Sequence, residues 1–268
     1  MARPVTFLSD YGLADEFVGV VHGVLARVCP DARVIDLTHG IPRHDVLAGA
    51  LALERALPYT PPGVHLAVVD PEVGARRRAV ALRVAEDDRV LVGPDNGLLL
   101  AAATRFGGVV EAVEISSSPW RLEPVSATFH GRDVFAPVAA RLAGGELVAA
   151  AGEPIDADEL VPLTRPSARR EGDTIVAHAV GTDVFGNVQL DLTTAELAGS
   201  ALRLGRPLRV DAGDGPYDAL YVRTFADVAA GALLIYEDAG GAVAVAVNSG
   251  DAASELGVRP GDEVRLAP

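Results

Sequence analysis

The stretch VHLAVVDPEVGARRRAV, residues 64–80, decides the fold of the first half of the chain. It opens with an apolar run of strand length and continues through Asp70 into a turn-rich segment that leads to Arg77. In an open α/β sheet, a carboxylate at the carboxyl end of a strand lies where such sheets bind their ligands. The stretch therefore predicts a buried strand and, at its end, a candidate functional residue.

From residue 4 to about residue 143, apolar runs of strand length alternate with segments of helical period. Strands are predicted at residues 5–9, 34–37, 64–69, 80–84 and 90–92. Helices are predicted at residues 15–28, from the N-cap Asp45 to residue 57, and at residues 134–142 with Asp133 as the cap. This alternation is typical of a sheet covered by helices, so we expect an N-terminal α/β sandwich-like domain at residues 1–165.

The second half of the chain follows a Pro- and Arg-rich stretch at residues 162–173, whose composition favours a linker. Beyond it, short Val- and Leu-rich runs are separated by Gly, Asp and Asn, and strands are predicted at residues 174–180, 188–192, 208–210, 219–222, 233–236 and 242–247. We expect a smaller C-terminal antiparallel β-barrel domain at residues 172–268.

Composition excludes several classes of function. The net charge of −14 and the absence of Lys disfavour binding to nucleic acid. No run of about 18 apolar residues is present, and the N-terminus does not have the form of a signal peptide, so we expect a soluble, cytoplasmic protein that does not bind membranes. Cys29 is the only cysteine, which rules out an internal disulfide and a cysteine metal cluster.

Three residue types suited to activating a water molecule occur near predicted strand and helix ends: Asp70, Arg77 and, in the segment TFHGRDVFAP, His130. Each has an ordinary interpretation, because an Asp and an Arg form salt bridges and a solitary His is usually a core or helix-entry residue. Together they supply an acid, a fixed cation and an imidazole, which are the groups needed to activate a nucleophile.

Two further segments carry candidate binding residues. Asp10 ends the first predicted strand, where it either stabilises a turn or accepts hydrogen bonds from a ribose diol. The segment TDVFGNVQ brings Asp183, Phe185 and Asn187 together around one Gly. These side chains can pair with an ammonium group, stack on a flat ring and bind a base edge, respectively.

One turn motif, and the absence of several well-known motifs, narrow the classes of function that the chain can have. The segment GPDNGLL contains the turn signal Asn96-Gly97, which favours a strand-to-helix turn. The chain has no G-x-x-x-x-G-K-[ST] loop, no G-x-G-x-x-G after the first strand, no G-x-S-x-G elbow and no H-E-x-x-H helix. Nucleoside triphosphates, dinucleotides, esterase chemistry and zinc-protease chemistry are therefore disfavoured.

The segments FLSDYG, VVDPEVG, GPDNGLL, TFHGRDVFAP and DVFGN, in this order, resemble the S-adenosyl-L-methionine (SAM) hydroxide adenosyltransferases. That family is the water-using branch of the superfamily that also holds the fluorinase and chlorinase. The resemblance covers residue 4 to about residue 247. It implies an α/β domain, a β-barrel-like domain and a homotrimer with SAM bound where domains of neighbouring subunits meet. The implied reaction converts SAM and water to adenosine and L-methionine with no metal or other cofactor.

The resemblance also implies roles for the substrate-binding residues. Asp10 would hold the ribose hydroxyls, Phe185 and Asn187 the adenine, and Asp183 the methionine ammonium group. Phe129 and Gly131, which flank the motif histidine, are expected at the substrate.

Asp70, Arg77 and His130 fall on the positions that distinguish the hydroxide branch from the halogenases. Arg77 cannot act as the base, since its pKa lies above about 12. We expect it to stabilise the developing hydroxide charge with Asp70 orienting it, while Asp70 or His130 accepts the proton. Two places depart from the family. Glu72 stands where a Gly, suited to a turn with positive φ, is usual, and the stretch YEDAGGAV, residues 236–243, replaces a Ser-rich version found in relatives.

Three alternatives compete with this function. A halogenase would bind chloride or fluoride in place of water, but Asp70 would put a negative charge beside the anion, although Gly131 matches a small residue of the chlorinase. A non-catalytic protein that binds SAM or adenosine would not require the intact set of Asp70, Arg77 and His130. An unrelated metal hydrolase could use the abundant carboxylates, and a chelator would reveal it.

Overall fold

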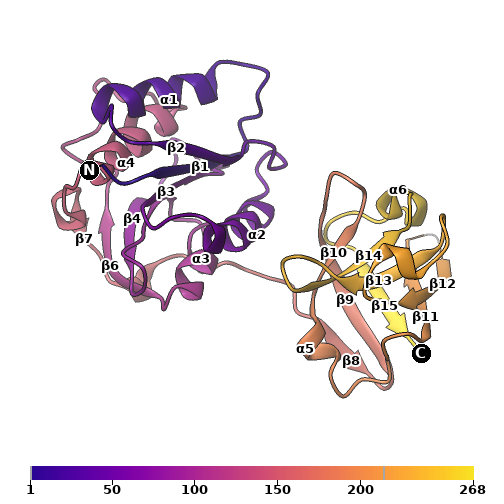
Figure 1. Cartoon of the computed structure of the whole chain (residues 1–268). Coiled ribbons are helices and arrows are strands. Elements are labelled where there is room, and N and C mark those ends of the chain that lie inside the picture. Colours follow the sequence, from indigo (N-terminus) through magenta and orange to yellow (C-terminus); the bar gives the residue numbers. More distant parts are fainter. Residues whose placement is uncertain (1, 214) are drawn as a thin grey trace. The chain divides into compact units, whose positions relative to one another are not determined.

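A computed structural model describes residues 2–213 and 215–268 and divides the chain into two compact units, residues 1–164 and 165–268 (Figure 1). The division falls within the Pro- and Arg-rich stretch at residues 162–173, and residues 161–168 have no regular secondary structure. Each unit has its own core, as expected of separate domains. Within the described residues, no helix is long and apolar enough to cross a membrane.

The first unit is built on a seven-stranded sheet with the order β2-β1-β3-β5-β4-β6-β7. The strands are β1 (Val5–Ser9), β2 (Val34–Thr38), β3 (Val64–Val68), β4 (Ala79–Val84), β5 (Val90–Pro94), β6 (Val109–Glu114) and β7 (Glu153–Pro154). The first four in the order pair in parallel, whereas β4, β6 and β7 join by antiparallel pairing. The sequence also predicts that the neighbouring strands at residues 80–84 and 90–92 pair, and the antiparallel pairing of β4 with β5 confirms this.

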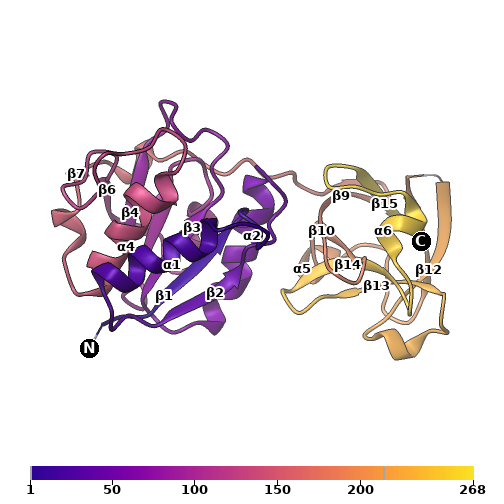
Figure 2. The same ribbon diagram turned by 90° about the horizontal axis from the view of Figure 1, so that it is seen from above.

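Helices cover both faces of this sheet (Figures 1 and 2). The helices are α1 (Phe17–Val28), α2 (Val46–Ala56), α3 (Leu100–Arg105) and α4 (Ala136–Ala143). On β3, Leu66 packs into the core with α1 and α4, and its neighbour Ala67 packs into the core with α2 and α3. Because both faces are buried, the strands are apolar at nearly every position, and the expected α/β sandwich is confirmed.

Of two predicted helix starts, the structure confirms the one at Asp45 and shifts the one at Asp15. The Asp45 side chain accepts a hydrogen bond from the Ala48 N–H at 2.9 Å, so the predicted N-cap of α2 is confirmed. Helix α1 begins at Phe17 rather than at Asp15, because the Asp15 carboxylate accepts the Phe17 N–H at 3.3 Å and occupies the turn before the helix.

The prediction that Asp133 caps the fourth helix is wrong. Asp133 lies inside a π-helical turn, Gly131–Phe135, that leads directly into α4. Its buried carboxylate accepts the Ser126 N–H at 2.8 Å and pairs with Arg132. The side chain therefore fixes the loop that precedes His130 instead of capping a helix.

The second unit is a β-barrel (Figure 2). Its strands are β8 (Arg169–Glu171), β9 (Thr174–Thr182), β10 (Val188–Thr193), β11 (Pro207–Ala212), β12 (Gly215–Tyr221), β13 (Leu233–Glu237), β14 (Ala242–Val247) and β15 (Glu263–Ala267), with short helices α5 (Thr194–Leu197) and α6 (Ala252–Leu256). The order is β10-β14-β13-β12-β11-β15-β9-β8, and pairing of β9 with β10 closes seven strands into the barrel. Pairing is antiparallel except between β12 and β13, which are parallel.

Candidate active site

The candidate site lies where the order of the parallel strands reverses. Strand β1 is flanked by β2 on one side and β3 on the other, and Ser9 of β1 is in register with Val68 of β3. Helix α1 follows β1 on one face, and α2 precedes β3 on the other. Such a reversal leaves a crevice at the carboxyl ends of the two strands, where Asp10 and Asp70 are found.

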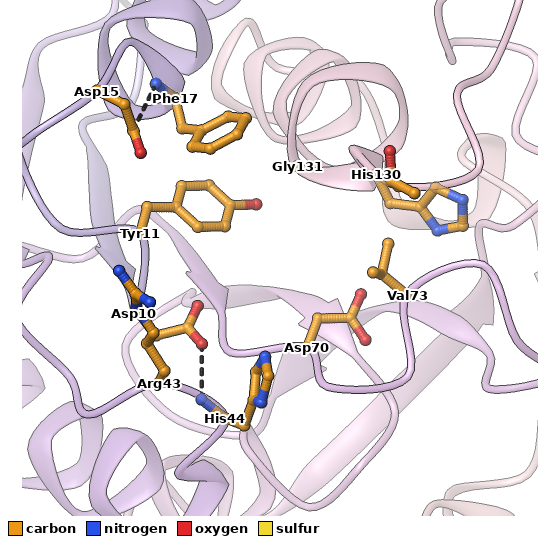
Figure 3. Close-up of a pocket in the computed structure, with 11 residues that line it drawn as sticks. Asp10, Tyr11, Asp15, Phe17, Arg43, His44, Asp70, Val73, His130 and Gly131 are labelled. Carbon is orange, nitrogen blue, oxygen red and sulfur yellow. Dashed lines mark hydrogen bonds between the residues drawn. The ribbon is translucent and has the colours of Figure 1, made fainter.

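A pocket of about 240 Å³ occupies this crevice (Figure 3). Four predicted site residues, Asp10, Asp70, His130 and Gly131, line it although they come from three distant segments. The remaining lining residues were not predicted as site residues: Tyr11, Asp15, Phe17, Arg43, His44, Val73 and Thr128. The volume is below the usual range for a complete small-molecule pocket, about 300–1,000 Å³. It suffices for part of a nucleoside-sized ligand.

Asp10 is held with its carboxylate facing the pocket (Figure 3). Its Oδ2 accepts the His44 backbone N–H at 2.9 Å. His44 adopts a φ of +66°, in the left-handed region, which is uncommon for a residue with a side chain. The loop before α2 is thus shaped to bring a backbone donor to Asp10.

Arg77 joins the other two predicted catalytic candidates. Its Nε donates to Asp70 Oδ1 at 2.8 Å, and its Nη2 donates to Asp70 Oδ2, which makes a bidentate ion pair. The same Nη2 lies 3.0 Å from His130 Nδ1. The Arg77 side chain is 4% exposed, and its guanidinium lies 5.1 Å from the Phe135 ring centroid. Arg77 therefore lies behind Asp70 and His130 and fixes both, while those two residues line the pocket.

The contact with Arg77 determines the protonation of His130. A guanidinium group only donates hydrogen bonds, so His130 Nδ1 accepts and the neutral imidazole carries its proton on Nε2. Burial and the Arg77 charge lower the pKa of His130 below its ordinary value of 6.5, outweighing the opposing effects of Asp70 and Asp133. His130 is consequently neutral at pH 7.

The loop that carries Asp70 is fixed at both ends. Asn96 Nδ2 donates to the Val69 carbonyl at 2.9 Å, so the Asn96-Gly97 turn supports the end of β3. Gly74 has a φ of +78°, and a Cβ there would lie 2.2 Å from the Ala127 carbonyl oxygen. The positive φ of this loop falls on Gly74 and not on Glu72. The side chain of Glu72 is therefore accommodated in an exposed turn without backbone strain.

A cluster of aromatic side chains forms one wall of the pocket. The Tyr11 ring packs against Phe17 at a centroid distance of 5.8 Å and edge-on against Phe129 at 5.9 Å. Phe17 and Phe129 meet edge-on at 4.9 Å. Phe129, predicted to bind substrate, thus supports Tyr11 and Phe17, which line the pocket. Burial and the charge of Asp10 raise the pKa of the Tyr11 hydroxyl far above its ordinary value.

The remaining predicted binding residues lie in the second unit. Phe185, which is 74% exposed, and Asn187 line a pocket of about 440 Å³ together with Phe225, Val247, Asn248, Ser249 and Gly250. Asp183 organises this loop: its Oδ1 accepts the N–H groups of Phe185 and Asn187, and its Oδ2 accepts Asn187 Nδ2 at 2.7 Å. The Asn187 amide is therefore oriented by Asp183.

The described residues contain one group of three side chains that could hold a metal ion: His22, Asp36 and His39. Asp36 Oδ1 lies 2.9 Å from His22 Nε2 and 3.1 Å from His39 Nε2, and His39 Nδ1 lies 2.8 Å from Ser9 Oγ. This arrangement links β2 to the end of β1. None of the three residues lines the pocket.

Some of the pocket residues that were not predicted lie next to sequence features that could have identified them. Tyr11 directly follows Asp10 in the segment FLSDYG, and Arg43 and His44 directly precede the N-cap Asp45. Both segments follow strand ends, which meet at the same edge of a parallel sheet. Phe17 has the pattern of a core helix residue and gave no such signal.

Comparison with known proteins bears on what this arrangement does. Residues 5–152 match the family model of the SAM hydroxide adenosyltransferase N-terminal domain, and residues 177–265 match that of the C-terminal domain. The chain is 54% identical to a protein of Salinispora tropica named (R)-S-adenosyl-L-methionine hydrolase, over 98% of this chain and 97% of that protein. A fluorinase of Nocardia brasiliensis is 29% identical over 98% and 97% of the two chains.

A solved structure agrees with the fold. The crystal structure of an uncharacterized conserved protein from Thermotoga maritima matches with a TM-score of 0.91 and 34% sequence identity, covering 98% of this chain and 100% of that chain.

Proposed function

This chain belongs to the SAM hydroxide adenosyltransferase family, and from that membership we infer that it is an enzyme that hydrolyses SAM to adenosine and L-methionine. One observation in the site supports this most directly: Arg77 joins Asp70 and His130 at the edge of a pocket that Asp10 also lines. Asp70 and His130 line the pocket, and Arg77 holds both in place.

The pocket is suited to a positively charged substrate. SAM carries a sulfonium cation, and Asp10, Asp15 and Asp70 place carboxylates around the pocket. We propose that Asp10, anchored through Oδ2 by the His44 N–H, uses its other oxygen to bind the ribose hydroxyls. Opposite charges in a partly enclosed site attract more strongly than they do in bulk water.

In the proposed step, a water oxygen forms a bond with C5′ of the ribose as the C5′–S bond breaks. The bonding electron pair goes to sulfur, so L-methionine leaves as a neutral thioether and needs no general acid. The attacking oxygen gains positive charge as the new bond forms, which makes its protons strongly acidic. A carboxylate can accept such a proton even when it is paired with a cation.

We assign the acceptance of that proton to Asp70, from which it passes to solvent. His130 is less suited, because its Nδ1 lone pair is engaged by Arg77 and its Nε2 carries a proton. Arg77 acts as a positioning residue in this scheme: it fixes the Asp70 carboxylate and the His130 tautomer. Alignment of water, carbon and sulfur supplies much of the acceleration.

A halogenase remains the second candidate because fluorinases are relatives of the chain. Electrostatics disfavours it, since the carboxylate of Asp70 lines the pocket in which a halide ion would have to bind. The scheme also uses no metal. The His22, Asp36 and His39 group lies outside the lining of the pocket, so the proposed step is not routed through it.

We further propose a homotrimer in which neighbouring subunits complete each site, as the family resemblance implies. The sizes and exposure of the pockets support this. The first unit offers a pocket of about 240 Å³, and in the second unit Phe185 is 74% exposed although its ring is suited to stacking on adenine. Size-exclusion chromatography with light scattering tests the stoichiometry.

The function is tested by incubating chelator-treated protein with SAM in chloride-free buffer and then with added chloride or fluoride. Products are separated by chromatography and identified by mass. Adenosine with L-methionine in every buffer supports the hydrolase. A 5′-halo-adenosine would assign the protein to the halogenases, and unchanged, bound SAM would assign it to binding proteins. A rate restored only by added metal would contradict the metal-free step.

A further inference from the structure

The Tyr11 hydroxyl occupies the space in which residue 131 would otherwise place a side chain. A Cβ built on Gly131 would lie 2.1 Å from Tyr11 Oη, which is far inside contact distance. Gly131 is therefore the residue that admits the phenol. Figure 3 shows the Tyr11 hydroxyl directed at the opening between Asp70 and the segment that carries His130 and Gly131.

The ring that carries this hydroxyl is held on several sides. Tyr11 packs against Phe17 and Phe129 and edge-on against Phe7, with a centroid distance of 6.3 Å to the last. The Tyr11 backbone N–H donates to Ser9 Oγ at 3.3 Å. The position of the hydroxyl is thus fixed by the fold before a ligand binds, as required of a group that orients a reactant.

The hydroxyl is also kept in its protonated form. Burial, together with the charges of Asp10 and Asp70, raises the pKa of Tyr11 well above its ordinary value, outweighing the opposing effect of Arg77. Tyr11 is therefore a neutral phenol at neutral pH. It can donate a hydrogen bond where the carboxylates of the pocket can only accept one.

We propose that the Tyr11 hydroxyl donates a hydrogen bond to the nucleophilic water and, with Asp70, fixes its position for attack. The inference rests on the proposed hydrolase function. A water molecule has two lone pairs and two protons. If one lone pair accepts from Tyr11 and one proton is directed to Asp70, the second lone pair is left free to attack C5′. One donor and one acceptor thus orient the lone pair that attacks.

The first test is Tyr11→Phe, which removes only the oxygen atom and keeps the ring packing. We expect kcat to fall about 10- to 100-fold, the loss expected for one well-oriented hydrogen bond, and KM for SAM to change less than about threefold. Tyr59→Phe is the matched control, because Tyr59 is 84% exposed and does not line the pocket. Circular dichroism and the melting temperature verify that each variant is folded.

The second test uses the space that the Tyr11 hydroxyl shares with a side chain placed at residue 131. Gly131→Ser alone should lower kcat, because its Cβ collides with Tyr11 Oη. In the double variant Tyr11→Phe/Gly131→Ser, the colliding oxygen is gone, and the nearest ring atom that remains lies 3.1 Å from the new Cβ, so a small shift of the ring admits the serine. The serine then brings a hydroxyl donor to the space that the phenol oxygen occupied. We expect the double variant to be faster than Tyr11→Phe. Relief of the collision alone would make the double variant only as fast as Tyr11→Phe, so a rate above that of Tyr11→Phe reports replacement of the lost donor.

The outcomes separate this inference from the hydrolase function. Wild-type protein that forms no adenosine contradicts the function itself. If the wild type forms adenosine while Tyr11→Phe keeps the wild-type kcat, the function stands and the role of Tyr11 is overturned. A double variant no faster than Tyr11→Phe, or a rise in KM that equals the fall in kcat, overturns that role as well.

Discussion

Arg77 Nη2 lies 3.0 Å from His130 Nδ1, and the guanidinium group also pairs with Asp70 through Nε and Nη2. One cation therefore sets the tautomer of the imidazole and the orientation of the carboxylate. Asp70 and Arg77 form an ordinary salt bridge, and this does not exclude a catalytic role for Asp70. The ion pair is the device that positions the group assigned to accept the proton.

Replacement of Arg77 should affect turnover much more than binding. Arg77→Ala removes the partner of a nearly buried carboxylate and leaves His130 free to change tautomer. We expect kcat to fall about 10²- to 10³-fold, similar to the loss of a key electrostatic group, with KM for SAM changed only severalfold. Arg77→Lys should not recover the rate, because an ammonium group cannot make the bidentate contact. Steady-state adenosine formation measures both, and wild-type turnover in either variant would remove Arg77 from the mechanism.

The rate should fall at acidic pH through His130. Burial and the charge of Arg77 lower the pKa of His130 below 6.5, so the neutral form persists to lower pH than for a free imidazole. Protonation of Nδ1 then breaks the contact with Arg77, and kcat should decline with a slope of one proton below that pKa. His130→Gln, whose amide oxygen can accept from Arg77 at any pH, should lack this limb. An unchanged acidic limb in the variant would assign it to another group.

Gly74→Ala should impair the site without touching substrate. Its Cβ would lie 2.2 Å from the Ala127 carbonyl oxygen, and a backbone atom cannot move aside cheaply. The loop that carries Asp70 would shift, and we expect kcat to fall about 10-fold or more, since misplacement by about 1 Å can cost 10²-fold. Gly108→Ala is the control, because Gly108 also has a positive φ but no atom within 4 Å of its Cβ. Equal activity of the two variants would contradict the positional argument.

Asp183→Ala should weaken the binding of both adenosine and SAM. The carboxylate accepts three N–H groups of its own loop and orients Asn187, which lines the pocket of the second unit. Loss of these bonds should raise Kd about 10-fold for each ligand, as measured by calorimetry. If SAM binding alone weakens, the pairing of Asp183 with the methionine ammonium group, and not its effect on the loop, is the dominant role.

Acid should destabilise the first unit through His65. This fully buried ring lies 2.8 Å from Thr6 Oγ1 and accepts from Arg89 Nη1 at 3.1 Å. Burial and the charge of Arg89 lower the pKa of His65 from 6.5 to about 3. Because the unfolded chain binds the proton first, the contribution of His65 to the free energy of unfolding is fully present above pH 6.5 and is lost as the pH falls toward 3. The loss is about 1.4 kcal/mol per pH unit.

Denaturant unfolding at pH 7 and pH 5 tests this contribution of His65. In His65→Gln, the amide can bond to both partners without titrating, so we expect the difference between the two pH values to shrink. If the variant loses as much stability as the wild type between these pH values, another group is responsible for the acid sensitivity.

The sequence predicted most of the elements of both units, because hydrophobic periodicity reports which face of an element is buried. Strands β6, β7, β8 and β15 and the bounds of the short helices α3, α5 and α6 were not predicted. Most of these segments are so short that they have too little period to be recognised. The cap at Asp133 was assigned from residue type alone. The side chain instead binds Ser126 and Arg132, and only the path of the chain brings Ser126 within reach.

Sequence alone identified four groups of the candidate site, Asp10, Asp70, Arg77 and His130, because their types fit the reaction and their motifs resemble a family. The tertiary structure decided how these groups act. Arg77 lies behind the pocket, His130 has its Nδ1 engaged, and Tyr11 fills the space beside Gly131. These relations join residues far apart in the chain, and they depend on which strands are adjacent at the reversal of the sheet. Residue type limits what a side chain can donate or accept, whereas its partner is set by the packing of the whole sheet.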